Sequence, residues 1–331
     1  MIGKIQSCAV IGHGSWATAL VSILAGNGID VRWSVRNPEV IDGVRQTGRN
    51  PRYLPSLRLP MDRISVYDNP DDAISDAPMV LVSVPSAFLK LYMENVQSCL
   101  CDRFVVSAIK GIVPGDYKTA IEWLHDTYSL SYSKMGMISG PSHAEEIAQE
   151  KLTCLTIVCP DKGDAQAIGS CLANGFVHVG YSSDLYGIEY AVVLKNIFAI
   201  AAGIASGLGY GDNFKAVLVS AAADEMERFI DIGYPYERDI CTPAYLGDLL
   251  VTCYSTFSRN RRLGQLIGQG LTVKSALNEM TMVAEGYYAA DCIRHMNLRY
   301  KADMPIADMV YDVLYRSVPA RVAMAALIER I

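Results

Sequence analysis

The feature that most constrains this chain is a glycine-rich turn near its start, Gly12-His13-Gly14-Ser15-Trp16-Ala17. The turn follows an apolar strand predicted for residues 8–11 and opens a helix predicted for 17–25, before a second strand at 31–35. In the G-x-G-x-x-G/A pattern, Gly12 permits the turn, Gly14 lets a pyrophosphate approach, and Ala17 is small enough for helix–strand packing. We expect a β-α-β dinucleotide site whose helix start faces the phosphates. A tight structural turn without a ligand is the alternative.

The rest of the chain falls into two parts of different character. Further strands are predicted at residues 79–84, 104–108, 135–138 and 153–158, with helical segments between several of them. This alternation favours a Rossmann-like, doubly wound and mostly parallel sheet in a domain over residues 1–185. From about Leu185 the strand-like runs give way to Ala-, Leu-, Ile- and Met-rich segments of helical period. An all-helical, substrate-binding domain is therefore predicted for 186–331.

Composition excludes several classes of protein. With 331 residues, 51% hydrophobic and 19% charged, the chain should fold as two well-buried domains. Its net charge of −6 gives no electrostatic footprint for nucleic acid or an anionic membrane. The nine cysteines are scattered and the pair Cys99-x-Cys101 lacks a zinc or thioredoxin spacing, so we expect a reduced, cytoplasmic chain. The five histidines form no spaced cluster, and no metal site is expected.

No transmembrane segment is expected either. The apolar stretch at residues 197–211 is shorter than the roughly 20 residues that a span requires. Lys4 and the apolar run after it resemble the first two regions of a signal peptide. The strand–turn–helix pattern of the same residues favours the cofactor unit instead.

Arg36 bears on the choice of cofactor. An acid about 20 residues after the glycine turn would bind the ribose 2′-hydroxyl of NAD. Here the second strand ends Trp33-Ser34-Val35-Arg36-Asn37, without an acid. Arg36 could pair with the 2′-phosphate of NADP or stack on adenine. An ordinary exposed arginine is the alternative.

Two lysines and an aspartate are candidates for proton transfer. Lys110 lies just past a predicted strand, where sites of open sheets are found. Lys195 interrupts a helix that is apolar almost all round, and a buried lysine needs a partner or a task. Burial or a second cation would lower a lysine pKa toward neutrality, and Asp248 could orient the amine. The alternatives are a structural salt bridge for Lys195 and a loop carboxylate for Asp248.

The segment around Arg259 is the best candidate for binding phosphate. Ser258 is predicted as an N-cap, Arg259 offers a bidentate fork, and the helix start adds N–H donors. The neighbouring Arg261 and Arg262 are more typical of a solvated face. A second turn, Gly140-Pro141-Ser142, ends another strand and could approach a ligand, although its spacing alone indicates only a turn.

Taken together, these motifs resemble the bacterial type of NAD(P)-dependent glycerol-3-phosphate dehydrogenase over nearly the whole chain. The motifs are Gly12-His13-Gly14-Ser15-Trp16-Ala17-Thr18-Ala19, Lys110-Gly111, Gly140-Pro141-Ser142, Leu194-Lys195-Asn196, Gly247-Asp248-Leu249, Ser258-Arg259-Asn260-Arg261-Arg262 and Glu285-Gly286. Each is unspecific alone, whereas their order and spacing are specific. Three positions depart from the family pattern: Ala17 replaces Gly, His143 replaces Phe, and Ala284 stands as an extra residue that leaves the assignment of Val283 open.

The resemblance implies roles at the matching positions. On the cofactor side it places Gly12, Gly14, Ser15, Trp16, Arg36, Lys110, Ala144, Arg259, Val283 and Glu285. On the substrate side it places Lys110, Gly140, Ser142, Lys195, Asp248, Ser258, Arg259 and Asn260. Lys195 would accept the proton, with Lys110 and Asp248 as the other catalytic residues.

The resemblance also implies a reaction, a reversible hydride transfer between NAD(P)H and dihydroxyacetone phosphate. The product, sn-glycerol 3-phosphate, would supply glycerophospholipid synthesis, and the family leads us to expect a homodimer that binds NAD or NADP and a small-molecule substrate. Two alternatives stay open. One is another Rossmann-plus-helical dehydrogenase, of the 3-hydroxyacid or 6-phosphogluconate type, and the other is a non-catalytic NAD(P)-sensing module.

Overall fold

The computed structural model describes residues 2–280 and 282–331 and divides the chain into two compact units. The first comprises the described part of Met1–Ile109 together with Ala120–Leu185, and the second comprises Lys110–Thr119 and Tyr186–Ile331. A single boundary at residue 185, as the sequence suggests, differs from this division at one segment. Residues 110–119 leave the first unit and pack within the second.

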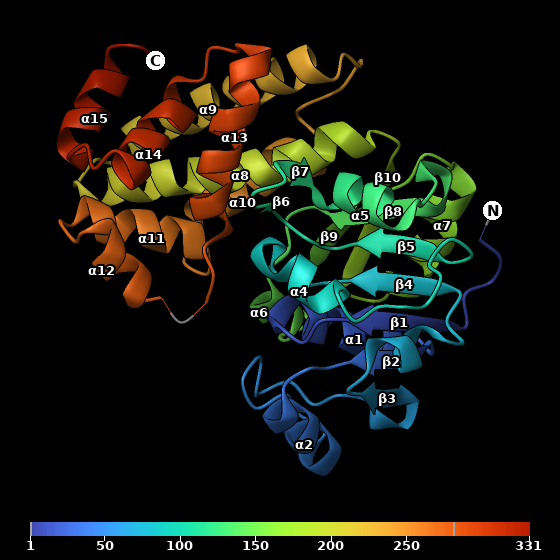
Figure 1. Cartoon of the computed structure of the whole chain (residues 1–331). Helices are drawn as coiled ribbons and strands as arrows, with labels where there is room; N and C mark the ends of the chain where they lie inside the picture. The colour runs from blue at the N-terminus through green and yellow to red at the C-terminus, as the bar shows by residue number, and fades with distance from the viewer. Residues whose placement is uncertain (1, 281) are drawn as a thin grey trace. The chain divides into compact units, whose positions relative to one another are not determined.

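The first unit is built on an eight-stranded sheet (Figure 1). Its strands are β1 (Ser7–Ile11), β2 (Asp30–Ser34), β3 (Ile64–Tyr67), β4 (Met79–Val82), β5 (Phe104–Ser107), β8 (Met135–Ser139), β9 (Thr153–Val158) and β10 (Val177–Ser182). They lie in the order β10-β9-β8-β5-β4-β1-β2-β3, and every neighbouring pair is parallel except β8 and β9. The predicted fold class is confirmed.

Burial explains which strands the sequence pattern reveals. All residues of β4, β5 and β8 are buried, and such strands have continuous apolar sequences because helices cover both faces of the sheet. The two strands missed by the sequence analysis, β3 and β10, lie at the two edges of the sheet. Most of their residues are exposed or half-buried, and they carry polar side chains.

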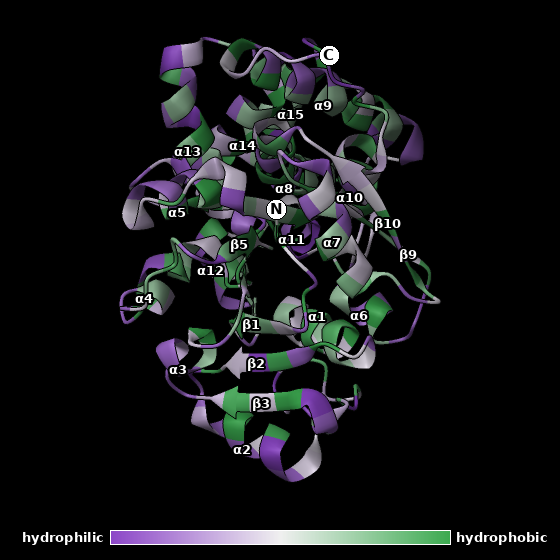
Figure 2. Cartoon of the chain, turned by 90° about the vertical axis from the view of Figure 1, so that its right-hand side faces the viewer, coloured by the Kyte–Doolittle hydropathy of each residue, from purple (hydrophilic) through white to green (hydrophobic). Residues whose placement is uncertain are grey.

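Helices cover both faces of this sheet. Figure 2 shows α1 (Ser15–Gly26), α6 (Ala144–Ile147) and α7 (Lys162–Leu172) on one face. The other face carries α3 (Pro70–Ile74), α4 (Leu89–Met93) and α5 (Ala120–Tyr128). Beside the edge strand β3 lies α2 (Pro38–Thr47), and the short turns η1 (Met61–Arg63), η2 (Ser86–Phe88) and η3 (Tyr132–Lys134) complete the unit. Trp33 of β2 is fully buried in the resulting core.

The cysteines need one correction. We expected a reduced chain, but Cys99 and Cys101 form a disulfide in an exposed loop after α4. Their Cα atoms are 5.5 Å apart, within the range that a disulfide spans, because the loop turns tightly about Leu100. The other seven cysteines are free.

The second unit is helical apart from a small hairpin. The hairpin pairs β6 (Ile112–Val113) with β7 (Lys118–Thr119). The helices are α8 (Leu185–Gly207), α9 (Asp212–Gly233), the π-helical η4 (Pro243–Gly247), α10 (Asp248–Tyr254), α11 (Arg259–Gly268), α12 (Val273–Asn278), α13 (Glu285–Tyr300), α14 (Pro305–Tyr315) and α15 (Ala320–Ile328). The prediction of a helical C-terminal domain is confirmed.

Helix α8 is longer than its apolar core suggested. By length and composition, its 23 residues could cross a membrane. The sequence analysis considered only the shorter stretch at 197–211 and expected no span. The qualifying window is nevertheless 100% buried within the protein. An α-helix that is apolar all round is typical of a protein core as well as of a membrane span.

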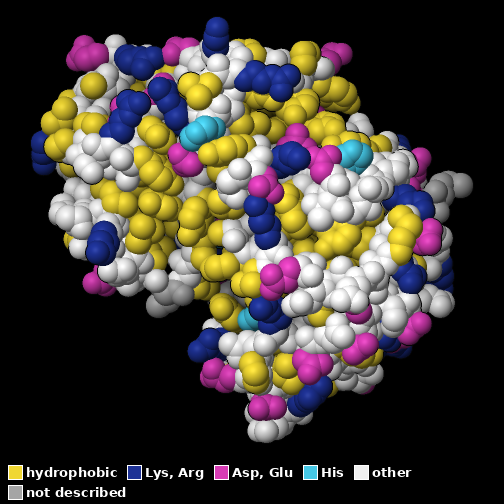
Figure 3. Space-filling view, viewed as in Figure 1, with side chains coloured by type: hydrophobic (Ala, Val, Ile, Leu, Met, Phe, Trp, Pro, Cys, Tyr) yellow, Lys and Arg dark blue, Asp and Glu magenta, His cyan; other side chains and the backbone are white. Residues whose placement is uncertain are grey.

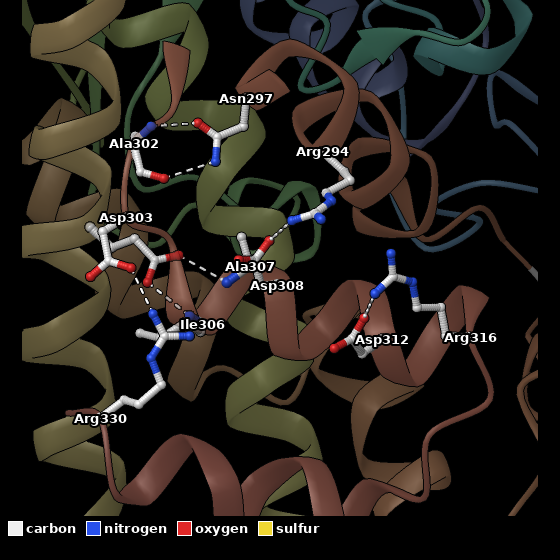
Figure 4. A network of polar contacts seen from close by, with 11 residues as sticks. Arg294, Asn297, Ala302, Asp303, Ile306, Ala307, Asp308, Asp312, Arg316 and Arg330 are labelled. Atoms are coloured by element: carbon white, nitrogen blue, oxygen red, sulfur yellow. Dashed lines mark hydrogen bonds and ion pairs between the residues drawn. The ribbon is translucent and has the colours of Figure 1, made fainter. Parts of the chain in front are cut away.

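A buried carboxylate fixes the start of α14 (Figure 4). Glu225 of α9 accepts hydrogen bonds from the backbone N–H groups of Ile306 and Ala307, at 2.8 and 2.9 Å. Burial raises the pKa of Glu225 to about 8, although these two bonds act in the opposite direction. One residue further, Asp308 pairs with Arg294 of α13 at 2.6 Å. Helices α9, α13 and α14 are thereby joined by polar contacts.

Helices α8 and α11 approach each other at glycines on both sides. A Cβ on Gly203 or Gly207 of α8 would overlap the backbone of Arg261 or Gln265 in α11. In return, a Cβ on Gly264 of α11 would overlap the carbonyl oxygen of Ile200. The two backbones are therefore in direct contact, which only glycine allows at these positions. We call this contact the glycine seam.

We predict that Gly264→Ala lowers the free energy of unfolding by about 3 kcal/mol, because the added methyl group forces the two helices apart. Urea denaturation followed by circular dichroism measures this loss. Gly26→Ala is the matched control, since it also lies in a helix but its Cβ would meet open space. That variant should be neutral or more stable by up to about 1 kcal/mol. Equal stability of the two variants would contradict the glycine seam.

Candidate active site

The glycine turn of the first unit has the backbone geometry that its sequence predicts. Gly12 has φ +117°, a conformation that L side chains rarely adopt, and a Cβ there would overlap the carbonyl oxygen of Ser83. The indole N–H of Trp33 donates a hydrogen bond of 2.6 Å to the carbonyl oxygen of Gly12. The turn is therefore fixed from both neighbouring strands, β2 and the segment after β4.

The start of α1 is open to a ligand. Gly14 is its N-cap residue, no side chain caps it within the described chain, and a Cβ on Gly14 would meet nothing within 4 Å. Ser15 and Ala17 are buried, which agrees with the need for a small third residue, whereas Trp16 is partly buried against the core. A helix start of this kind presents backbone N–H groups and a positive dipole end to phosphate.

Asn50 supports the turn and was missed by the sequence analysis. This fully buried side chain donates hydrogen bonds to the carbonyl oxygen of His13 (3.0 Å) and to the hydroxyl of Thr18 (2.9 Å). Asn50 lies in a loop far along the chain from the turn. No local pattern marks it, because its role depends on tertiary contact.

Arg36 lies just past the end of β2, and its side chain is exposed. Its guanidinium lies 5.0 Å from the ring centroid of Tyr92 and donates a hydrogen bond of 3.0 Å to the carbonyl oxygen of Leu91.

Burial, with the nearby charges of Arg36 and Arg52, lowers the pKa of His13 to about 4. The imidazole is therefore neutral at physiological pH, and the positive charge beside the turn comes from the arginines.

The second turn of the first unit follows β8. Gly140 has φ +100°, and a Cβ on it would lie 2.8 Å from the carbonyl oxygen of Cys154. The hydroxyl of Ser142 donates a hydrogen bond of 3.0 Å to the carbonyl oxygen of Gly140. His143 is the N-cap residue of the short helix α6, and Ala144 is its buried first residue. Gly140 is thus required by the backbone itself.

The second unit buries a lysine against an aspartate. Lys195 lies in the middle of α8 with 3% of its surface exposed, and Asp248, with 1% exposed, forms an ion pair with it. Asp248 is the first residue of α10 rather than part of a loop. Two charges removed from water in this way require one another, because either alone would be strongly destabilised.

Lys110 joins this pair from the segment that crosses into the second unit. Burial and the charge of Lys195 lower the pKa of Lys110 to about 8, although Asp248 acts in the opposite direction. An amine of this pKa exchanges protons near neutral pH. The structure therefore brings together the three residues that the sequence analysis selected for proton transfer.

A chain of asparagine side chains connects these groups with α11 and α13. The amide of Asn196 donates to the carbonyl oxygen of Lys110 (2.7 Å), and that of Asn260 donates to Asn196 Oδ1 (2.8 Å). Asn260 Oδ1 in turn accepts from the backbone N–H of Gly286 (2.9 Å). We call this set the asparagine relay. Asn196 belongs to the motif Leu194-Lys195-Asn196, but sequence alone does not indicate its role, because a lone asparagine beside a lysine carries no signal.

The predicted phosphate corner lies at the start of α11. Ser258 caps the helix, as expected, by accepting a hydrogen bond of 3.2 Å from the N–H of Arg261. Ser258, Arg259 and Arg262 line a pocket of about 250 Å³ together with residues 256–257, 279–280 and 282. Arg262 is exposed, so a solvated arginine also borders the pocket. Glu285, the first residue of α13, and Val283 before it are half-buried.

The predicted site residues thus form two groups, each within its own unit. Gly12, Gly14, Ser15, Trp16, Arg36, Gly140, Ser142 and Ala144 belong to the first unit. Lys110, Lys195, Asp248, Ser258, Arg259, Asn260, Val283 and Glu285 belong to the second. The first group is suited to a dinucleotide, since its glycine cradle and open helix start fit a pyrophosphate. The second combines a buried lysine–aspartate pair with the cationic start of α11.

Comparison with protein families gives a match in both units. Residues 7–165 match the model of the NAD-dependent glycerol-3-phosphate dehydrogenase N-terminus, and residues 184–325 match that of the C-terminus. The glycerol-3-phosphate dehydrogenase (NAD(P)+) of Staphylococcus carnosus is 38% identical, and the alignment covers 98% of each chain. The enzyme of the same name from Geobacillus kaustophilus is 35% identical over 98% of this chain and 95% of its own.

Solved structures give the same result. The glycerol-3-phosphate dehydrogenase of Coxiella burnetii superposes with a TM-score of 0.90 at 27% identity, covering 99% of this chain and 100% of the other. A D-mandelate dehydrogenase in complex with NADH has a TM-score of only 0.59 at 14% identity, and that likeness shows the fold alone.

We predict that Asp248→Asn lowers the free energy of unfolding by about 3–5 kcal/mol, because it leaves the Lys195 ammonium buried without its partner. The double variant Lys195→Met/Asp248→Asn removes the unpaired charge and should recover part of that loss. Urea unfolding of the two single variants and the double variant forms a thermodynamic cycle that measures the coupling. Additive losses would show that the pair is not coupled.

Proposed function

The chain belongs to the NAD-dependent glycerol-3-phosphate dehydrogenase family, and from this premise we propose that it interconverts sn-glycerol 3-phosphate and dihydroxyacetone phosphate with NAD or NADP. The observation that carries the proposal is the buried Lys195–Asp248 pair with Lys110 beside it. This is the proton-exchanging group that oxidation of an alcohol requires.

The cofactor supplies the hydride chemistry when bound, and the protein binds and orients it. The backbone N–H groups at the start of α1 hold the pyrophosphate, with Gly12 and Gly14 leaving room for it. Ser15 and Trp16 contact the cofactor from the same turn, and Arg36 binds at its adenosine end. On the family resemblance we assign further cofactor contacts to Lys110, Ala144, Arg259, Val283 and Glu285.

Lys195 moves the proton. As the substrate alcohol is oxidised, Lys195 Nζ accepts the hydroxyl proton, and in the reverse direction its ammonium returns it. Asp248 holds the amine in place through the ion pair. Lys110 stabilises the negative charge that develops on the substrate oxygen.

The phosphate of the substrate is held at the start of α11. Arg259 and Asn260 clamp it, Ser258 adds a hydroxyl, and the helix start adds N–H donors. Gly140 and Ser142 complete the substrate contacts on the family resemblance. Binding energy from the phosphate, which does not react, fixes the position of the reacting carbon.

The match of both units to one family displaces the alternatives from the sequence analysis. The models that match residues 7–165 and 184–325 are those of glycerol-3-phosphate dehydrogenase, which speaks against a 3-hydroxyacid or 6-phosphogluconate enzyme. A non-catalytic sensing module would have no need of a buried lysine–aspartate pair, which is costly to maintain.

We further propose that the protein acts in the cytoplasm as a homodimer and supplies glycerol 3-phosphate for glycerophospholipid synthesis. Seven of the nine cysteines are free, which supports a reducing compartment although Cys99 and Cys101 are paired. The homodimer rests on the family resemblance, and exposed apolar side chains of the helical unit, among them Val217, Leu250 and Leu298, are candidates for its interface.

Oxidation of NADH and NADPH with dihydroxyacetone phosphate, followed by absorbance, tests the reaction. We predict that Lys195→Met lowers turnover by about 10²–10⁴-fold, because in this direction the substrate oxygen loses its proton donor. Cofactor binding, measured by fluorescence titration, should be retained. Lys162→Met, which removes a lysine from α7, is the control and should turn over normally. Near-normal turnover of Lys195→Met would refute its assignment.

We predict that Arg36→Asp lowers kcat/KM for NADPH by about 10- to 100-fold, since it replaces a charged partner of the 2′-phosphate by a repelling one. The value for NADH should change much less or rise. Arg58→Asp, at an exposed position elsewhere in the first unit, is the control of equal charge. If kcat/KM falls equally for NADH and NADPH, Arg36 does not bind the 2′-phosphate.

A further inference from the structure

We propose that a second cavity in the helical unit binds a long-chain fatty acyl carboxylate. The cavity holds about 910 Å³ and is lined by Leu208, by residues 267–274 with 277–278, by Tyr287 and by residues 313–314 and 317–321. It shares no residue with the proposed active site or the phosphate corner. Its volume lies in the range of sites for small molecules.

The walls of the cavity are mainly aliphatic. Leu271, Val273 and Leu277 come from the α11–α12 segment, and Val313 and Val318 come from the end of α14 and the turn after it. Several of these side chains, including Leu271, Val273 and Val318, are only half-buried. Figure 3 shows hydrophobic side chains gathered on the face that carries α11, α12 and α14. An apolar ligand would remove this surface from water, which is the main driving force for binding.

The charges at the cavity have one sign. Lys274 and Arg321 belong to its lining, and no Asp or Glu occurs among the lining residues that the structure describes. Neither cation forms an ion pair or a side-chain hydrogen bond with another described residue. Arg321 also lies in the first turn of α15, which has no acidic residue and where the helix dipole disfavours a cation. Lys274 and Arg321 are both exposed, so an anion that enters the cavity would face two accessible cations and no competing carboxylate among the described lining residues.

The lining selects the class of ligand. Tyr287 is the one aromatic side chain among the described lining residues, so a flat ring system would find little to stack on. Aliphatic walls with cations of one sign fit a flexible hydrocarbon chain that ends in a single anionic group. A fatty acyl carboxylate has this form.

Calorimetric titration of the full chain with dodecanoate, kept below its micelle concentration, tests the proposal. One molecule should bind per chain, and affinity should rise by about fourfold for each methylene buried, from octanoate to dodecanoate. Lys274→Glu/Arg321→Glu should weaken binding at least about tenfold, because it reverses both charges. Lys151→Glu/Lys162→Glu makes the same change of charge in the other unit and should bind normally.

Leu271→Asp provides a second and independent variant, because it places a carboxylate in the apolar wall and should also abolish binding. Circular dichroism of each variant checks that it folds. Absence of binding, or equal binding by the Lys274/Arg321 variant and its control, would overturn the proposal. If dodecanoate does not bind and the Lys274→Glu/Arg321→Glu variant converts a dimer to monomers, the occupant of the cavity is a second copy of the chain. The assay requires no turnover, so its outcome is independent of the dehydrogenase activity.

Discussion

The glycine seam between α8 and α11 is the contact on which the helical unit depends. Gly203 and Gly207 on one helix and Gly264 on the other bring two backbones together without intervening side chains. Because Lys195 and Asn196 lie two turns before the seam on α8, the start of α11 is held beside them. The asparagine relay requires that α8 and α11 lie this close together. Its three hydrogen bonds of 2.7–2.9 Å add polar contacts between these two helices, the segment at Lys110 and the start of α13.

The helical unit also places its charges where they are most costly. Lys195 and Asp248 are almost completely buried, and Lys110 is forced toward its neutral form by burial and by its neighbour. A folded chain gains little stability from such an arrangement, since desolvation offsets the attraction between the charges. The arrangement makes chemical sense if it prepares an amine to take and return a proton. Stability is then supplied elsewhere, by the apolar body of α8 and by contacts such as Glu225 at the start of α14.

The sequence predicted most of the fold and selected Lys110, Lys195 and Asp248, which the structure brings together. Strands with continuous apolar runs, such as β4 and β5, were found because burial on both faces leaves a strong signal, whereas the mixed edge strands β3 and β10 were missed. Lys195 was found because a charge within an apolar helix is rare. Asn50 and Asn196 were missed because their partners are distant in sequence, and only the folded chain shows that their amides are needed. The position of Asp248 at the start of α10 and the Cys99–Cys101 disulfide likewise depend on local backbone geometry, which the spacing of residues in the sequence does not predict.

The chain crosses between the two units more than once, because residues 110–119 belong to the second unit. The chain passes from one unit to the other after Ile109, after Thr119 and again after Leu185. The helical unit cannot be cut out as one continuous fragment, because a fragment beginning at residue 186 would lack Lys110 and the β6–β7 hairpin. Exchange of halves between related chains at one junction would likewise combine a lysine of one parent with the aspartate of the other. The buried cluster of Lys110, Lys195 and Asp248 therefore has to be inherited from both sides of that junction at once.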